Sequence, residues 1–179
     1  AGIQPGDIIL TTPFSFVSST NVILYEGAIP VFVDVEPRSG NIDVKKLAEA
    51  AADLTSGDPQ RIARWLPRTS AEKPGKLRAI LAVDVFGQPA DFDAIRHIAD
   101  EYNLKLIEDS CEALGAEYKG RKAGLLGDYG VFAFYPNKQI TTGEGGIIVT
   151  NDDQAADFMA SMRNQGRDQG DTWLQHTKL

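Results

Sequence analysis

The sequence predicts one α/β domain in which a mostly parallel β-sheet is covered by helices. Six short runs are apolar at nearly every position and rich in β-branched residues, as expected for strands buried on both faces. Helix-like stretches with capping residues mostly alternate with these runs, which indicates βαβ units with right-handed crossovers. The predicted strands are Ile8–Thr12, Val31–Val35, Ala79–Val83, Leu104–Glu108, Val131–Tyr135 and Gly146–Thr150.

Four helices are predicted from start signals that precede periodic apolar residues. The third has one apolar face at helical spacing, and its charged residues point to the opposite side. That pattern is typical of a helix packed on a sheet. The predicted helices are Val17–Tyr25 after Ser15, Val44–Asp53 after Asp43, Phe92–Tyr102 after Asp91, and Gln154–Met162 after Asn151-Asp152.

The alternation of strands and helices stalls in Thr55–Gly75, which is rich in Pro, Gly, Ser and charged residues. We interpret it as a surface excursion in which Arg61–Leu66 forms a short helix and Trp65 is the apolar anchor. The polar stretch Asn164–Leu179 stops without a helix end or a core strand. The chain also begins on a turn without Met, so we expect a domain that is truncated at both ends.

Composition narrows the class of protein. The 179 residues are 42% apolar and carry a net charge of −7, which fits a globular domain and, without any basic stretch, argues against nucleic-acid binding. The apolar runs are too short for a membrane span.

A single cysteine, Cys111, cannot form an internal disulfide, so a cytoplasmic location is expected. With only His97 and His176 beside that cysteine, a zinc-type metal site would lack ligands, and His97 is expected on a helix surface or in packing.

Common nucleotide and hydrolase motifs are absent. The sequence contains no GxxxxGK[ST] loop, and the glycines at Gly143–Gly146 have the wrong spacing for GxGxxG. No histidine lies in a loop where it could act as the base of a Ser-His-Asp triad. A dinucleotide-dependent oxidoreductase therefore ranks behind the other functions considered below.

A carboxylate and a lysine remain as candidate functional groups. Asp109 follows a predicted strand at the carboxyl end, where open α/β sheets bind ligands, although acids there are also common helix caps. Lys138 lies on a Gly-rich connection between two predicted strands, although a loop lysine is usually just solvated. Lysine forms a Schiff base with an aldehyde and a carboxylate keeps a pyridine nitrogen protonated, so the pair suits pyridoxal phosphate (PLP). Phe16, after the first strand, could stack on the ring or pack in the core.

Several segments, in order and spacing, resemble the DegT/DnrJ/EryC1/StrS family of PLP-dependent sugar-nucleotide aminotransferases. Lys138 follows Asp109 by twenty-nine residues, and the resemblance covers nearly the whole chain except Thr55–Gly75. It implies the large domain of the type I PLP-dependent aminotransferase fold, with residues 1–179 as a partial PLP-binding domain that lacks the small C-terminal domain. The matching segments are Gly6-Asp7, Thr12–Phe16, Gly27–Asp34, Phe86–Asp91, Glu108–Ala116, Phe132–Lys138 and Thr142–Gly146.

The resemblance also implies roles for individual residues. Lys138 would bind the cofactor covalently and later move the proton, Asp109 would pair with the pyridinium nitrogen, and Phe16 would stack on the ring. By the resemblance, position 112 would lie near the cofactor's hydroxyl; the family often has Gln or His there, and Glu112 departs from that pattern. Ala133 stands where many members carry a phosphate-binding Ser, so phosphate anchoring from this segment is expected to be weaker.

The function implied by the resemblance is transfer of an amino group from an amino acid, glutamate being expected, to a keto-sugar nucleotide by a homodimer. One alternative is a sugar dehydrase of the same family, in which a His replaces the lysine, so Lys138 argues against it. Another is a non-catalytic truncated fragment that is unable to hold PLP.

Overall fold

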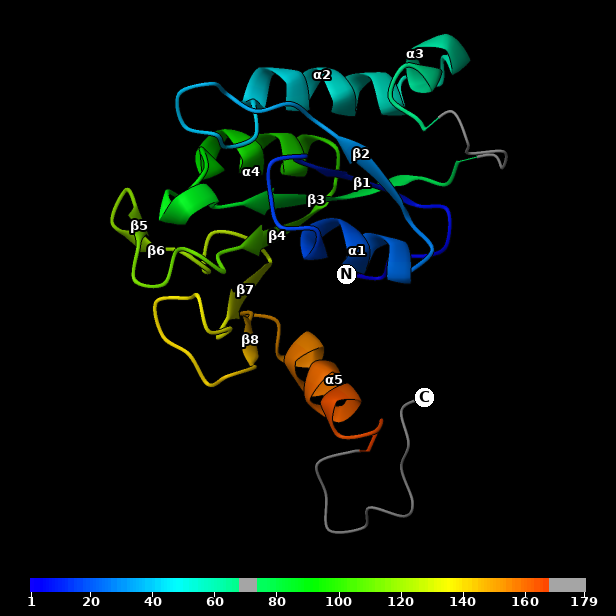
Figure 1. The fold of residues 1–179 in the computed structure, drawn as a ribbon. Coiled ribbons are helices and arrows are strands. Elements are labelled where there is room, and N and C mark those ends of the chain that lie inside the picture. The colour runs from blue at the N-terminus through cyan, green and yellow to red at the C-terminus, as the bar shows by residue number, and fades with distance from the viewer. Residues whose placement is uncertain (68–73, 168–179) are drawn as a thin grey trace.

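The computed structural model describes residues 1–67 and 74–167, and a six-stranded sheet forms its centre (Figure 1). The strand order is β2-β1-β3-β4-β7-β8, in which every neighbouring pair is parallel except β7 and β8. This arrangement confirms the predicted α/β class with a mostly parallel sheet. The strands are β1 (Ile8–Thr11), β2 (Ile29–Phe32), β3 (Leu77–Val83), β4 (Lys105–Asp109), β7 (Tyr129–Ala133) and β8 (Gly146–Val149).

Helices cover both faces of this sheet (Figure 1). On one face α2 (Val44–Thr55) and α4 (Phe92–Glu101) pack in a large apolar core, and on the other α1 (Ser18–Tyr25) contributes to a smaller one. The short α3 (Pro59–Ala63) follows α2, and α5 (Asp153–Arg163) follows β8. The predicted apolar face of α4 is buried, namely Phe92, Ile95, Ile98 and Ala99.

Two of the four predicted helix caps are formed. The Asp43 carboxylate accepts hydrogen bonds from the N–H groups of Lys45 and Lys46, and Asp152 likewise caps α5. Asp91 precedes α4 but makes no cap, because its carboxylate accepts the Tyr118 hydroxyl at 2.5 Å instead.

The predicted cap of the first helix is not formed. The helix begins at Ser18, one residue after the predicted Val17, and no side chain caps it. The Ser15 hydroxyl lies 2.8 Å from that of Ser19 and is therefore engaged away from the helix N-terminus.

Strand boundaries differ most at the edge of the sheet. The predicted strand Val31–Val35 lies at Ile29–Phe32, because its partner β1 ends at Thr11, which pairs with Phe32. A hairpin of two-residue strands, β5 (Glu117–Tyr118) and β6 (Arg121–Lys122), was not predicted, since so short a strand carries no periodic pattern.

The described part of the Thr55–Gly75 excursion packs back on α2. Its helix is α3, which begins earlier than the predicted Arg61–Leu66 because Asp58 caps it and Pro59 occupies its first turn. Trp65 packs against the core as expected, and its Nε1 donates to Asp53 Oδ2 at 2.9 Å. Residues 68–73 of the excursion and residues 168–179 of the predicted C-terminal stretch lie outside the described residues. Over the described ranges, no helix has the length and apolar character needed to cross a membrane.

Candidate active site

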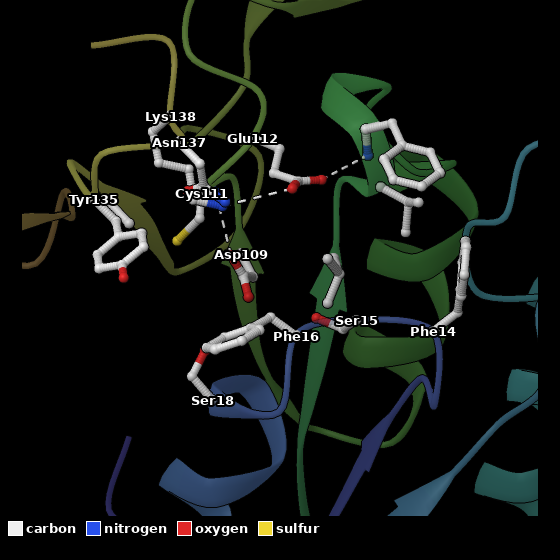
Figure 2. Close-up of a pocket in the computed structure, with 14 residues that line it drawn as sticks. Phe14, Ser15, Phe16, Ser18, Asp109, Cys111, Glu112, Tyr135, Asn137 and Lys138 are labelled. Carbon is white, nitrogen blue, oxygen red and sulfur yellow. Dashed lines mark hydrogen bonds and ion pairs between the residues drawn. The ribbon is translucent and has the colours of Figure 1, made fainter. Parts of the chain in front are cut away.

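A cavity of about 400 Å³ opens at the carboxyl ends of the parallel strands, within the size range of small-molecule sites (Figure 2). Its walls come from segments that follow four strands, so residues far apart in the sequence meet there. The lining residues are Phe14, Ser15, Phe16 and Ser18 after β1; Val83, Val85 and Phe86 around the end of β3; Asp109, Cys111 and Glu112 at and after β4; and Ala133, Tyr135, Asn137 and Lys138 at and after β7.

Asp109 is fixed at the end of β4 by bonds to two different elements. Its Oδ2 accepts the Ser19 hydroxyl of α1 at 2.8 Å, and its Oδ1 accepts the Cys111 N–H at 3.2 Å. The bond to Cys111 caps a local turn. The alternative that Asp109 is only a cap therefore accounts for Oδ1 and not for Oδ2. The carboxylate nevertheless lines the cavity and is half-buried. It is oriented before any ligand binds.

Lys138 is drawn into the cavity rather than solvated. Its side chain is only 16% exposed, and its Nζ lies 3.6 Å from Glu112 Oε1. The other Glu112 oxygen accepts the Phe86 N–H at 3.0 Å, and the Gln139 side chain donates to the Glu112 carbonyl. Glu112 thus holds the lysine amine over the cavity, as Figure 2 shows.

Phe16 lies beside Asp109 at the wall of the cavity (Figure 2), and 77% of the residue is exposed. The core-packing alternative for this ring is therefore not realised. The exposed face of the Phe16 ring lies at the same cavity as a carboxylate and a lysine, so a planar ligand can stack on it.

A pair of aromatic rings lines the cavity wall beside the segment that follows β3. Phe14 and Phe86 meet edge to face with their centroids 5.7 Å apart, and Phe86 has a positive φ of 53° that is uncommon for a non-glycine residue. The next residue, Gly87, also has positive φ, and a Cβ there would lie 2.8 Å from the Glu112 carbonyl oxygen. The absence of a side chain at Gly87 therefore allows the Glu112 segment to approach Phe86.

Cys111 is not a candidate nucleophile. Burial, with the charge of Asp109 beside it, raises the pKa of the Cys111 thiol far above its usual value, so the thiol stays protonated.

All four residues singled out from the sequence, Phe16, Asp109, Glu112 and Lys138, line this one cavity. The role of Ser19 in holding Asp109 was not predicted, because its hydroxyl lies ninety residues away in sequence and only the packing of α1 under the sheet brings it there. Phe14 and Phe86 were missed as cavity walls, since single exposed aromatic residues between the predicted strands and helices carry no distinguishing pattern.

Comparison with known proteins gives consistent results. The model of the DegT/DnrJ/EryC1/StrS aminotransferase family matches residues 1–178. GDP-perosamine synthase of Caulobacter vibrioides is 42% identical over 167 residues, which cover 93% of this chain and 39% of that protein. The chain thus spans about 40% of the length of this curated relative.

Solved structures agree in fold. The crystal structure of a DegT DnrJ EryC1 StrS aminotransferase from Brucella abortus superposes with a TM-score of 0.82 at 33% identity, covering 99% of this chain and 43% of that one. A GDP-4-keto-6-deoxy-D-mannose-3-dehydratase of Escherichia coli, solved with bound hydrated PLP, has a TM-score of 0.74 at 28% identity, covering 92% of this chain and 37% of that one.

Proposed function

Because the chain belongs to the DegT/DnrJ/EryC1/StrS aminotransferase family, a family of PLP-dependent enzymes, we propose that the protein carrying it transfers an amino group to a keto-sugar nucleotide. The proposed amino donor is an amino acid, glutamate in the first instance. One observation carries the proposal: Lys138, Asp109 and Phe16 line a single cavity of small-molecule size.

The residues present fit the cofactor's ring and aldehyde. The cavity offers one amine, a carboxylate whose oxygens are already fixed by two donors, and an exposed aromatic face. Lys138 would hold the aldehyde carbon, Asp109 the ring nitrogen, and Phe16 one face of the ring. The described lining residues offer fewer partners to the cofactor's phosphate than to its ring and aldehyde. Ala133 has no hydroxyl, and Lys138 is the one cationic side chain among them.

When bound, PLP supplies an electron sink for the carbanion formed during transamination. The protein's own contribution is then to place charge and move a proton. Asp109 would keep the proton on the ring nitrogen through a charge-assisted hydrogen bond, because Ser19 and Cys111 leave its carboxylate little freedom to turn away. Lys138 Nζ would take the proton from the α-carbon of the substrate and return it two atoms further along, to the carbon on the other side of the nitrogen, acting as general base and then acid.

Glu112 has a place in this scheme before cofactor binding. Its carboxylate pairs with the Lys138 ammonium at 3.6 Å, which keeps the amine pointing into the cavity. Covalent capture of an aldehyde requires the free amine, so Lys138 has to give a proton away and leave this ion pair. Glu112 would then be free to approach the cofactor's hydroxyl, as the resemblance implies for this position.

The same chain supports further proposals on organisation. We place residues 1–179 within the cofactor-binding large domain and propose that the protein is a cytoplasmic homodimer. Support for the homodimer comes from apolar side chains that are about half exposed on β8 and α5: Ile147, Ile148, Phe158 and Met162. A dehydrase is less well supported, since a lysine stands where the resemblance implies a histidine for that activity.

The test is borohydride reduction of the full natural protein after incubation with PLP, followed by peptide mapping. We expect one pyridoxyl adduct, on Lys138, and none in a Lys138→Ala variant. A Lys122→Ala variant removes an exposed lysine outside the cavity and serves as the control that keeps the adduct. An adduct on another lysine, or no adduct, would remove Lys138 from its proposed role.

Amino transfer itself is measured with glutamate or glutamine as donor and a 4-keto-sugar nucleotide as acceptor. Formation of the amino sugar supports the proposal, whereas loss of a hydroxyl without amination supports the dehydrase alternative.

A further inference from the structure

A cluster of buried acidic groups lies beside the cavity, on the opposite side of β4 from the Asp109 carboxylate. Asp84, Glu108 and Ser110 have side chains that are fully buried, with 0% exposure each. Successive side chains of a strand point to opposite faces, so the residues on either side of Asp109 both face away from the cavity. None of the three lines the cavity or takes part in the proposed chemistry.

The hydrogen bonds in this cluster require one proton more than the hydroxyl can supply. Ser110 Oγ lies 2.8 Å from Asp84 Oδ2 and 3.1 Å from Glu108 Oε1. A hydroxyl has one hydrogen and can make one full hydrogen bond as a donor, not two. Both contacts are full hydrogen bonds only if one of the two carboxyl groups is itself protonated.

The partners of each carboxyl group identify the protonated one. Glu108 accepts three backbone N–H groups, from Gly124 at 2.6 Å, Leu126 at 2.8 Å and Gly127 at 3.2 Å, which is an environment for an anion. Apart from the serine, Asp84 accepts one, from Ala90 at 3.1 Å. The proton therefore belongs on Asp84.

The direction of each hydrogen bond follows from that assignment. Asp84 Oδ2–H donates to Ser110 Oγ, and the Ser110 hydroxyl donates to the Glu108 carboxylate. Burial, together with the neighbouring charge of Glu108, raises the pKa of Asp84 to about 7, in agreement with the count of protons. Among the described residues, Glu108 is the charged group that faces Asp84. The nearby Asn41 side chain is neutral; it accepts the Val85 N–H and donates to the Gln88 carbonyl.

The cluster holds both chain neighbours of Asp109. Ser110 and Glu108 are bridged through side chains, and the Asp84 N–H donates to the Asp109 carbonyl at 3.0 Å. We propose that Asp84 is a positioning residue for Asp109, acting as a neutral acid that shares one proton with Glu108 through Ser110. The role assigned to Asp109 rests on the proposed function, whereas the shared proton does not.

Loss of this proton has a structural consequence. With Asp84 ionised, two buried carboxylates compete for one serine hydrogen and repel each other. The end of β4 then shifts, and the Asp109 carboxylate shifts with it. The environment of the ring nitrogen is expected to change with the same pH midpoint.

Infrared spectroscopy of the full natural protein without cofactor tests the shared proton. A protonated carboxyl group has a C=O absorption that is distinct from that of a carboxylate. We expect such a band at pH 6, its loss by pH 8.5 with a midpoint near 7, and a shift of the band on labelling with [4-¹³C]aspartate. The label assigns the proton to an aspartate even if no variant folds.

Variants then assign the residue. The band is expected to be absent in Asp84→Asn and retained in Asp34→Asn, which makes the same change at an exposed aspartate paired with Lys46. A protein without this band at pH 6, or with a band that the aspartate label does not move, would overturn the proposal.

The positioning role is read from the absorption spectrum of bound PLP across pH 6 to 8.5. A spectral transition near pH 7 is expected in the natural protein and in Asp34→Asn, and its loss in Asp84→Asn. Identical spectral titrations in the natural protein and Asp84→Asn would overturn the positioning role. If PLP does not bind at all, the proposed function fails, and the infrared band still decides whether the proton is shared.

Discussion

Asp109 shows how one carboxylate serves both the local structure and a ligand. One oxygen caps a turn and the other accepts a serine hydroxyl from the opposite layer of the fold, so the group cannot swing out of the cavity without breaking two bonds. Preorganised charge of this kind stabilises a transition state without any reorganisation during the reaction. Removing the charge of Asp109 should therefore lower the amino-transfer rate more than the amount of bound cofactor.

We predict that Asp109→Asn in the full natural protein lowers the amino-transfer rate by about 10²- to 10³-fold while the cofactor content falls much less. The amide retains the size of the side chain and can still accept hydrogen bonds, but it has no charge to hold a proton on the ring nitrogen. Single-turnover kinetics and PLP absorbance measure the two quantities, with Asp34→Asn as the control for the same change at an exposed site. A variant that transaminates at the natural rate would reduce Asp109 to a turn cap.

At the level of elements, the first residue of helix α2 is set by the residue just before it. Asp43 bonds the N–H groups of Lys45 and Lys46, at 2.9 and 3.2 Å, before an apolar face that is buried against the sheet. We predict that Asp43→Ala costs about 1 kcal/mol in the free energy of unfolding and that Asp43→Asn costs little, because asparagine caps equally well. Urea denaturation of both variants measures the difference, and equal stabilities for Ala and Asn would show that the cap contributes nothing.

Local sequence predicts some of these elements and caps but not others. Caps at Asp43 and Asp152, the presence of the six strands and the burial of β1 and β3 were predictable, because each depends on residues within one turn or one strand. The prediction that the last strand is buried on both faces was wrong, since three of the four residues of β8 are exposed. Ser15 and Asp91 carry equally good capping side chains, yet Ser19 and Tyr118 compete for them after folding. Tertiary partners decide such cases, and a single sequence does not reveal them.

Some features of the cavity could likewise be predicted from the sequence and others could not. Parallel strands place their carboxyl ends together, so Asp109 and Lys138 could be expected at one site. The ion pair of Lys138 with Glu112 and the proton held between Asp84 and Glu108 depend on distances set by loops after β3, β4 and β7. Loop conformation is not encoded by hydrophobic periodicity, so the sequence alone could not predict these two features.

At the level of the whole molecule, the sheet is covered by helices on both faces only up to β4, and apolar side chains are exposed beyond β7. The first four strands of the sheet order are covered by α1 on one face and by α2 and α4 on the other, as Figure 1 shows. On β8 and α5, by contrast, Ile147, Ile148, Phe158 and Met162 are about half exposed. Exposed apolar side chains on an edge strand and on the helix that follows it are expected to drive association when they are left uncovered.

We predict that the 179-residue chain, expressed on its own, binds PLP at least about 100-fold more weakly than the full natural protein and self-associates. The chain spans about 40% of a curated relative, and Lys138 is the one cation lining the described cavity, so the phosphate gains few partners for the water it gives up. Absorbance titration with PLP measures the first effect and sedimentation velocity the second. An Ile148→Lys variant tests the surface: it should reduce association without strengthening PLP binding, because β8 lies outside the cavity wall. A monomeric chain that binds PLP as tightly as the full protein would mean that the described cavity suffices for the cofactor and that the exposed strand needs no cover.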